Sequence, residues 1–157
     1  MELIVEFKKL ETDEEIIKTK ELIGEYIKWL NQDLSYQDID EELQKFPEKY
    51  REPFGTFIIA KVNENVIGCV GLKKLDDKIC EMKRLYVHDN YKGKGIGKKL
   101  TELIIQEAKT KNYEKMRLDT FNIMEVALKI YYENGFQKIN SYYNNPNEGV
   151  IYLEKIL

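Results

Sequence analysis

The sequence is poor in cysteine, proline and histidine, and each shortage excludes something. It contains two cysteines, three prolines and one histidine. Cys69 and Cys80 have neither the spacing of a zinc motif nor the number needed for a disulfide framework. Both lie in apolar, strand-like runs, so we expect buried free thiols, which suit a reducing cytosol. No group of histidine, cysteine and aspartate has metal-ligand spacing, so we expect no metal.

Long apolar runs and a strong charge imbalance are also missing. No run approaches the ~20 apolar residues that cross a membrane, and residues 1–10 do not resemble a signal peptide. We therefore expect a cytoplasmic protein that does not enter the membrane. A net charge of −3 gives no reason to expect nucleic-acid binding. A chain of 157 residues predicts one domain, residues 1–157.

The hydrophobic periodicity predicts a mixed α/β domain in which strands outnumber helices. The three central strands are separated by short turn sequences, so we expect them to be antiparallel. Thr12 and Glu15 have capping-box spacing, Ser35 is expected to cap the second helix, and Gly135 is expected to end the last helix. Helices are predicted at 12–30, 35–46, 97–112 and 123–134, and strands at 2–7, 54–62, 65–75, 79–87, 115–121, 136–143 and 149–156.

The stretch 91–100, YKGKGIGKKL, combines three glycines with four lysines between a predicted strand and a predicted helix. Backbone N–H groups at a helix N-terminus lack intrahelical partners and can bind an anion. Glycine lets such a backbone approach a phosphate without a Cβ clash. The stretch therefore predicts a polyphosphate-binding loop, and the simpler alternative is a helix-capping turn that binds nothing.

Two common phosphate loops do not fit this stretch. A Walker A motif needs Ser or Thr after the Gly-Lys pair, but Lys99 follows Gly97-Lys98. A Rossmann loop needs GxGxxG after a parallel strand, whereas these glycines run GxGxG after predicted hairpins. Residues 92–97 instead resemble the (Arg/Gln)-x-x-G-x-(G/A) loop of the GNAT superfamily of N-acetyltransferases, although Lys92 replaces the usual Arg or Gln.

The resemblance to the GNAT superfamily continues outside the loop. EMKRLYV at 81–87 resembles the family's fourth strand, and ALKIYYENGF at 127–136 resembles its A-x-x-LYEKxGF signature, with Tyr131 at the tyrosine position. The resemblance implies a single α+β domain with a mixed, mostly antiparallel sheet of about seven strands and four helices. It also implies acetyl transfer from acetyl-CoA to a primary amine by direct attack in a ternary complex.

The resemblance further implies roles for individual residues. Tyr131 is the candidate general acid and Glu81 the candidate general base; the alternatives are a packing tyrosine and a solvent-facing glutamate paired with lysine. Met124 stands where many members carry a coenzyme-contacting asparagine, and His88 is expected to be structural. The coenzyme is expected to contact the main chain of Leu85, Tyr86 and Val87 along its pantetheine arm, and the loop residues Lys92, Gly93, Lys94, Gly95, Ile96, Gly97 and Lys98 at its pyrophosphate.

In this fold the first two helices and the loop between the last two strands enclose the acceptor. Aromatic and carboxylate side chains there would suit an amine cation on a small molecule or a peptide; these are Tyr26, Trp29, Tyr36, Tyr142, Tyr143, Glu25, Asp33 and Asp38. Because many family members dimerise, a homodimer is compatible with the resemblance. Two other functions stay open: a non-catalytic acetyl-CoA sensor, and a nucleotide-binding protein that uses the same glycines.

Overall fold

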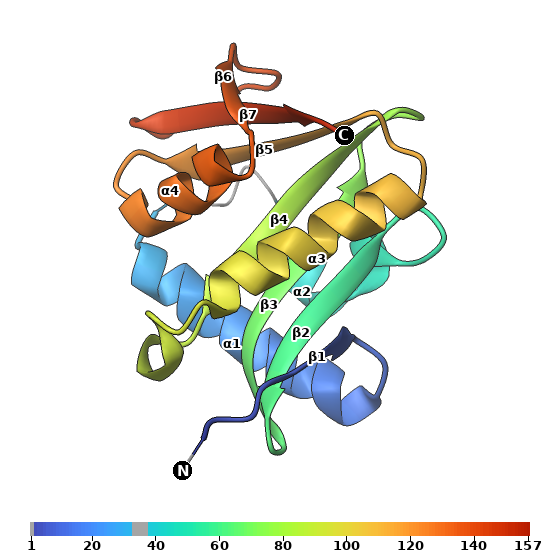
Figure 1. The fold of residues 1–157 in the computed structure, drawn as a ribbon, viewed down its shortest axis with the longest axis vertical. Coiled ribbons are helices and arrows are strands. Elements are labelled where there is room, and N and C mark those ends of the chain that lie inside the picture. The colour runs from blue at the N-terminus through green and yellow to red at the C-terminus, as the bar shows by residue number, and fades with distance from the viewer. Residues whose placement is uncertain (1, 33–37) are drawn as a thin grey trace.

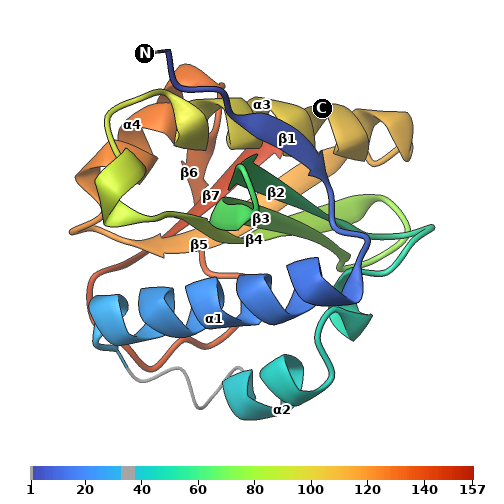
Figure 2. The ribbon, with the colours of Figure 1, turned by 90° about the horizontal axis from the view of Figure 1, so that it is seen from below.

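The computed structural model describes residues 2–32 and 38–157 as one central sheet with helices on both faces (Figures 1 and 2). The sheet has seven strands in the order β1-β2-β3-β4-β5-β7-β6. The strands are β1 (Glu6–Lys9), β2 (Thr56–Val62), β3 (Asn65–Lys74), β4 (Ile79–Val87), β5 (Lys115–Phe121), β6 (Gln137–Ile139) and β7 (Val150–Ile156). The helices are α1 (Asp13–Leu30), α2 (Ile39–Gln44), α3 (Ile96–Thr110) and α4 (Glu125–Glu133), with short 3₁₀ turns η2 (Glu48–Tyr50) and η3 (Asp89–Tyr91).

The sheet is antiparallel except at its centre. Strands β1 to β4 pair antiparallel in chain order, and β7 pairs antiparallel with both β5 and β6. Strands β4 and β5 are parallel neighbours, joined by the crossover helix α3. Figure 2 shows α1 and α2 on one face and α3 and α4 on the other. The predicted fold class is therefore confirmed.

Two predicted helix signals act as expected. The Thr12 hydroxyl accepts the Glu15 N–H at 3.1 Å while the Glu15 carboxylate accepts the Thr12 N–H at 3.1 Å, which completes the capping box. Gly135 follows α4 with φ +89°, and the Phe136 N–H donates to the Tyr131 carbonyl at 3.1 Å. This is the Schellman geometry expected of a glycine just beyond a helix.

Three predicted boundaries were wrong or fall outside the described residues. The first strand begins at Glu6 instead of residue 2, and partners for residues 2–4 in this register would lie beyond Val62, where β2 ends. The strand predicted at 136–143 ends at Ile139. Helix α2 begins at Ile39 with Asp38 as its N-cap, and the predicted cap Ser35 lies outside the described residues.

The core lies on both sides of the sheet. Leu100, Ile104 and Ala108 of α3 are fully buried, whereas Leu103 is half-buried. On the other face, Ile23 of α1 packs in a cluster with Phe46 and Phe57. Burial raises the pKa of both free thiols, Cys69 and Cys80, to about 12, so they are inert core residues as predicted.

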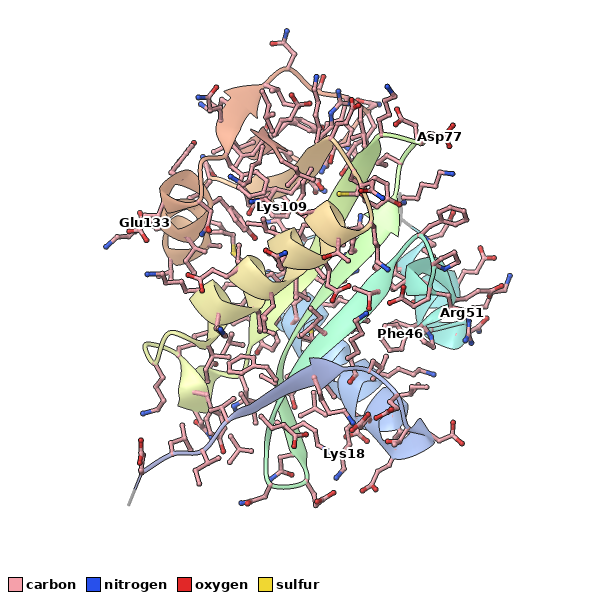
Figure 3. The ribbon with its side chains drawn as sticks, turned by 45° about the vertical axis from the view of Figure 1, so that its right-hand side comes forward. Lys18, Phe46, Arg51, Asp77, Lys109 and Glu133 are labelled. Atoms are coloured by element: carbon pink, nitrogen blue, oxygen red, sulfur yellow. The ribbon has the colours of Figure 1, made fainter. Side chains whose placement is uncertain are left out.

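The strands also give the molecule its length. Asp77, in the turn between β3 and β4, lies at the opposite end of the molecule from Lys18 of α1 (Figure 3).

In the described part of the chain, every helix is too short or too polar to cross a bilayer.

Candidate active site

Strands β4 and β5 separate partway along their length. They pair only from Ile79 with Lys115 to Glu81 with Arg117, yet β4 continues to Val87 and β5 to Phe121. Figure 1 shows the two strands starting together and diverging toward α4. Each strand therefore leaves backbone groups without a neighbouring strand in the middle of the sheet.

A bulge in β4 accompanies this separation. Cys69 of β3 faces Tyr86 while Gly71 faces Lys83, so β4 has one extra residue between these pairs. Arg84 has a φ of +61°, which is uncommon for a residue other than glycine. Bulges of this kind bend a strand and change the direction of the following side chains. The bulge immediately precedes the predicted pantetheine-binding residues 85–87.

A buried ion pair attaches the bulge to α2. The Arg84 guanidinium donates from Nε and from a terminal nitrogen to the two carboxylate oxygens of Glu42, at 2.9 and 3.0 Å. The Tyr50 hydroxyl donates to the same carboxylate at 3.0 Å. Burial opposes ionisation of Glu42, but Arg84 outweighs it and holds the pKa of Glu42 below its ordinary value. Sequence reasoning missed this pair, because residues 42 and 84 share no motif.

The separated strands enclose a cavity that passes through the sheet. Helix α1 contributes Tyr26 and Leu30, whereas Tyr131 belongs to α4 on the opposite face. The strand residues around the cavity are Met82, Lys83, Arg84 and Leu85 of β4 and Leu118, Asp119, Thr120 and Phe121 of β5, and Met124 also contacts it. The cavity therefore connects the two faces of the sheet at the predicted pantetheine path.

Tyr131 lies in the wall of this cavity, together with Leu85. Its side chain is buried, and its ring meets Phe136 edge-on with 5.7 Å between centroids. Burial raises the pKa of Tyr131 above its ordinary value, and the negative charge of Asp119 raises it further. The phenol is protonated at neutral pH and can donate a hydrogen bond or a proton. The neighbouring Tyr132 is exposed.

Glu81 is buried at the point where the two strands separate. Only 3% of the residue is exposed, so the solvent-facing alternative does not describe it. Its Oε2 accepts a hydrogen bond from the Tyr142 hydroxyl at 2.6 Å, while its Oε1 lies 3.6 Å from Lys83 Nζ and 3.9 Å from Lys73 Nζ. Glu81 does not itself contact the cavity; Lys83 lies between them.

The segment 140–149 covers this region instead of continuing strand β6. Figure 2 shows it on the side of the sheet that carries α1 and α2. Tyr142 reaches Glu81, and Tyr143 donates to Asp119, which also accepts from Asn145 at 3.1 Å. A strand was predicted at 136–143, but Tyr142 and Tyr143 instead bond to carboxylates on β4 and β5. Tyr142 and Tyr143 thus lie beside the cleft, where the acceptor was expected.

The glycine loop joins the end of β4 to the start of α3. Gly93 and Gly95 have φ near +78°, a conformation that favours glycine, and an added Cβ at either position would meet nothing within 4 Å. The first α3 hydrogen bond runs from the Lys99 N–H to the Gly95 carbonyl at 3.1 Å. The amides of residues 96–98 precede it and have no partner within the helix.

The side chains around the loop also suit an anion. The first turn of α3 contains no acidic residue but does contain Lys98 and Lys99, which the helix dipole disfavours there unless an anion is present. A Cβ on Gly97 would lie 3.5 Å from Ile130 of α4 and 3.7 Å from Val87 of β4. The loop, the end of β4 and the tyrosine helix, predicted separately, therefore meet in one place.

Several other candidate residues have different neighbours from those expected. Lys92 Nζ contacts Asp89 at 2.8 Å and lies 4.5 Å from the centre of the Trp29 ring. His88 Nδ1 accepts the Asn90 N–H at 3.2 Å. Tyr26 contacts the cavity, whereas Tyr36 and Asp33 lie outside the described residues. Over residues 2–32 and 38–157, no group of three metal-binding side chains is present.

Comparison with known proteins identifies the family to which this chain belongs. The profile of the Acetyltransferase (GNAT) family matches residues 23–136. The chain belongs to the GNAT acetyltransferase family. An uncharacterized N-acetyltransferase of Dictyostelium discoideum is 31% identical over 95% of this chain and 97% of its own length, and one of Schizosaccharomyces pombe is 35% identical over 85% and 83%.

A solved structure of a GNAT relative shows the same fold with the coenzyme present. The PaiA N-acetyltransferase of Thermoplasma acidophilum in complex with coenzyme A is 24% identical and has a TM-score of 0.77, over 99% of this chain and 100% of its own. The predicted family and fold are confirmed, and the chain is a GNAT acetyltransferase. The roles of its individual residues stay predictions.

Proposed function

We propose that this GNAT protein transfers the acetyl group of acetyl-CoA to a primary amine by direct attack in a ternary complex. The observation that carries the proposal is the cavity between β4 and β5, which is lined by Tyr131 of α4 on one face of the sheet and by Tyr26 and Leu30 of α1 on the other. Donor and acceptor can enter from opposite faces and meet between β4 and β5. The backbone groups left unpaired by strand separation are available to bind a peptide-like arm.

The residues of the glycine loop fit a pyrophosphate. The space beyond Gly93 and Gly95 is open, and the amides of residues 96–98 are available as donors. Lysines at positions 94, 98 and 99 are exposed and attract the anion over a longer range. Acetyl-CoA would supply the activated thioester. The protein would hold that thioester beside Leu85.

Two side chains would then move protons. As the amine nitrogen bonds to the carbonyl carbon, Glu81 accepts the amine proton, directly or through a water molecule. As the carbon–sulfur bond breaks, Tyr131 donates to the departing thiolate. Tyr131 carries this proton at neutral pH, because even the ordinary pKa of tyrosine is about 10, and burial raises the pKa further. The presence of both Glu81 and Tyr131 favours an enzyme, because a non-catalytic acetyl-CoA sensor would need only the glycine loop.

Replacement of Tyr131 by phenylalanine tests the proposal. We expect Tyr131→Phe to lower kcat by roughly 10²-fold, because the thiolate leaves without a general acid. Thiol release from acetyl-CoA, measured with a panel of primary amines, reports the rate. Tyr132→Phe is the matched control and should leave kcat unchanged, since Tyr132 is exposed.

Either of two results would contradict this proposal. Equal rates for Tyr131→Phe and the wild type would remove the general-acid role. Absence of thiol release with every amine, in a protein that binds coenzyme A, would count against acetyl transfer to amines.

Substitution in the glycine loop tests coenzyme binding separately. We expect Gly95→Val to weaken coenzyme A binding by roughly 10²-fold or more, because a β-branched residue disfavours the φ of +78° and displaces amides that bind phosphate. Titration calorimetry measures the Kd. Gly97→Ala is the control, since its Cβ would make ordinary contacts and its Kd should change less than about tenfold. Equal Kd values for the two variants would exclude the loop as the phosphate site.

A further inference from the structure

Lys83 places a buried ammonium group in the cleft, two residues after Glu81 on β4. Its side chain is 11% exposed and contacts the same cavity as Tyr131. It follows the last β4–β5 residue pair, so it lies where the strands have already separated. The acetyl-transfer steps assigned to Glu81 and Tyr131 do not use it.

This ammonium has unused hydrogen-bonding capacity. Its nearest counter-charge is Glu81 Oε1 at 3.6 Å, and that oxygen also lies near Lys73, while Tyr142 bonds the other oxygen. Among residues 2–32 and 38–157, the structure records no hydrogen bond from Lys83 Nζ, although an ammonium has three N–H donors. Burial lowers the pKa of Lys83, and Glu81 opposes that effect. An anion bound beside Lys83 would supply hydrogen-bond acceptors for its N–H groups.

The other charged groups nearby have close partners. Arg84 is held by Glu42 through two hydrogen bonds. Arg117 donates to Glu154 at 2.8 Å. Asp119 accepts hydrogen bonds from Tyr143 and Asn145. Among the charged groups of the described residues here, only Lys83 and Lys73 lack a hydrogen-bonded partner, and of these two only Lys83 contacts the cavity.

We propose that Lys83 binds the carboxylate of the acceptor, and that the acceptor is a free amino acid whose amine lies beside Glu81. The proposal rests on the proposed acetyl transfer. A zwitterionic amino acid has its two charges on neighbouring groups, and Lys83 and Glu81 present the complementary charges 3.6 Å apart. The carboxylate would accept N–H bonds from Lys83 while the amine loses its proton toward Glu81 and attacks the thioester.

Matched substrates and matched variants test this subsite. Thiol release would be measured with each common L-amino acid beside the amine that lacks its carboxylate, such as L-phenylalanine beside phenethylamine. The variants are Lys83→Met, which keeps an apolar stem, Lys83→Arg, which keeps a carboxylate-binding charge, and Lys73→Met. Lys73 is the control because it contacts the same Glu81 oxygen but is more exposed and does not contact the cavity.

We expect the wild type to prefer its best amino acid over the matched amine by roughly 10- to 100-fold in kcat/KM, the effect of one charge-assisted hydrogen bond. Lys83→Met should lose this preference through a higher KM, with kcat changed by less than about threefold. Lys83→Arg should keep part of the preference and Lys73→Met all of it. Equal use of amino acid and amine by the wild type would overturn the proposal. So would an equal loss of kcat in Lys83→Met and Lys83→Arg, because that would indicate proton transfer by Lys83.

Direct binding separates failure of this subsite from failure of acetyl transfer. The coenzyme A-loaded protein would be titrated calorimetrically with the same amino acids. Binding to the wild type that is lost in Lys83→Met supports the subsite even if no thiol is released, in which case only acetyl transfer fails. Absence of amino-acid binding to the loaded wild type overturns the subsite whatever the activity toward other amines.

Discussion

Glu81→Gln should lower kcat/KM for the amine acceptor by roughly 10²- to 10⁴-fold, the range that one general base contributes. Glutamine keeps the shape of the side chain and can still accept the Tyr142 hydrogen bond, but it cannot take a proton from the amine. The fold should therefore survive while the chemistry slows. Thiol release under saturating acetyl-CoA measures the rate.

The control for this experiment is Glu114→Gln, at an exposed glutamate that pairs with Lys78 on the surface. Its kcat/KM should equal that of the wild type, as should the coenzyme A affinity of Glu81→Gln. A Glu81→Gln rate within threefold of the wild type would rule out Glu81 as the base. Weakened coenzyme binding would instead indicate that Glu81 supports the fold of the cleft.

Glu42→Gln should lower the free energy of unfolding by about 3 kcal/mol or more, because it leaves the buried Arg84 guanidinium without a counter-charge. Chemical denaturation at neutral pH measures this loss. The double variant Glu42→Leu with Arg84→Met should recover a large part of it, since neither charge then remains buried. A single-variant loss below about 1 kcal/mol would show that the pair does not stabilise the fold.

The neighbouring residue supplies the control for Glu42. Glu41 forms an exposed pair with Lys45, so Glu41→Gln should change the free energy of unfolding by less than about 1 kcal/mol. The contribution of Glu42 should also depend on pH. Because the pKa of Glu42 is lower in the folded chain than its ordinary 4.5, its stabilisation is complete above pH 4.5 and declines as the pH falls below that value. The wild-type advantage over Glu42→Gln should shrink accordingly.

Local signals predicted most of the fold. The capping box at Thr12, the glycine at position 135 and the turn-separated runs of β2 to β4 each depend on a few adjacent residues, and the structure contains all of them. Predictions were wrong where a distant partner decided the outcome. Residues 140–143 were predicted to continue a strand, but Tyr142 and Tyr143 bond to carboxylates on β4 and β5.

The candidate site was predictable to a similar extent. Motif spacing placed Tyr131 and the glycine loop, and the structure brings both to the end of β4. The burial of Glu81 and of the Lys83 ammonium was not predictable, because it depends on how distant segments cover the sheet. The Arg84–Glu42 pair joins residues that no local pattern relates.

The separation of β4 from β5 gives the sheet two inner edges in addition to the outer edges at β1 and β6. An exposed strand edge can pair with a strand of another chain. These two edges are enclosed by α1 and α4, so they have room only for a narrow ligand. In the proposed complex the pantetheine arm, which carries amide groups, fills the gap as a short additional strand. Such binding depends on hydrogen bonds to the main chain of β4 and β5. Side chains along these two edges can therefore vary during evolution, whereas the spacing of the two strands cannot.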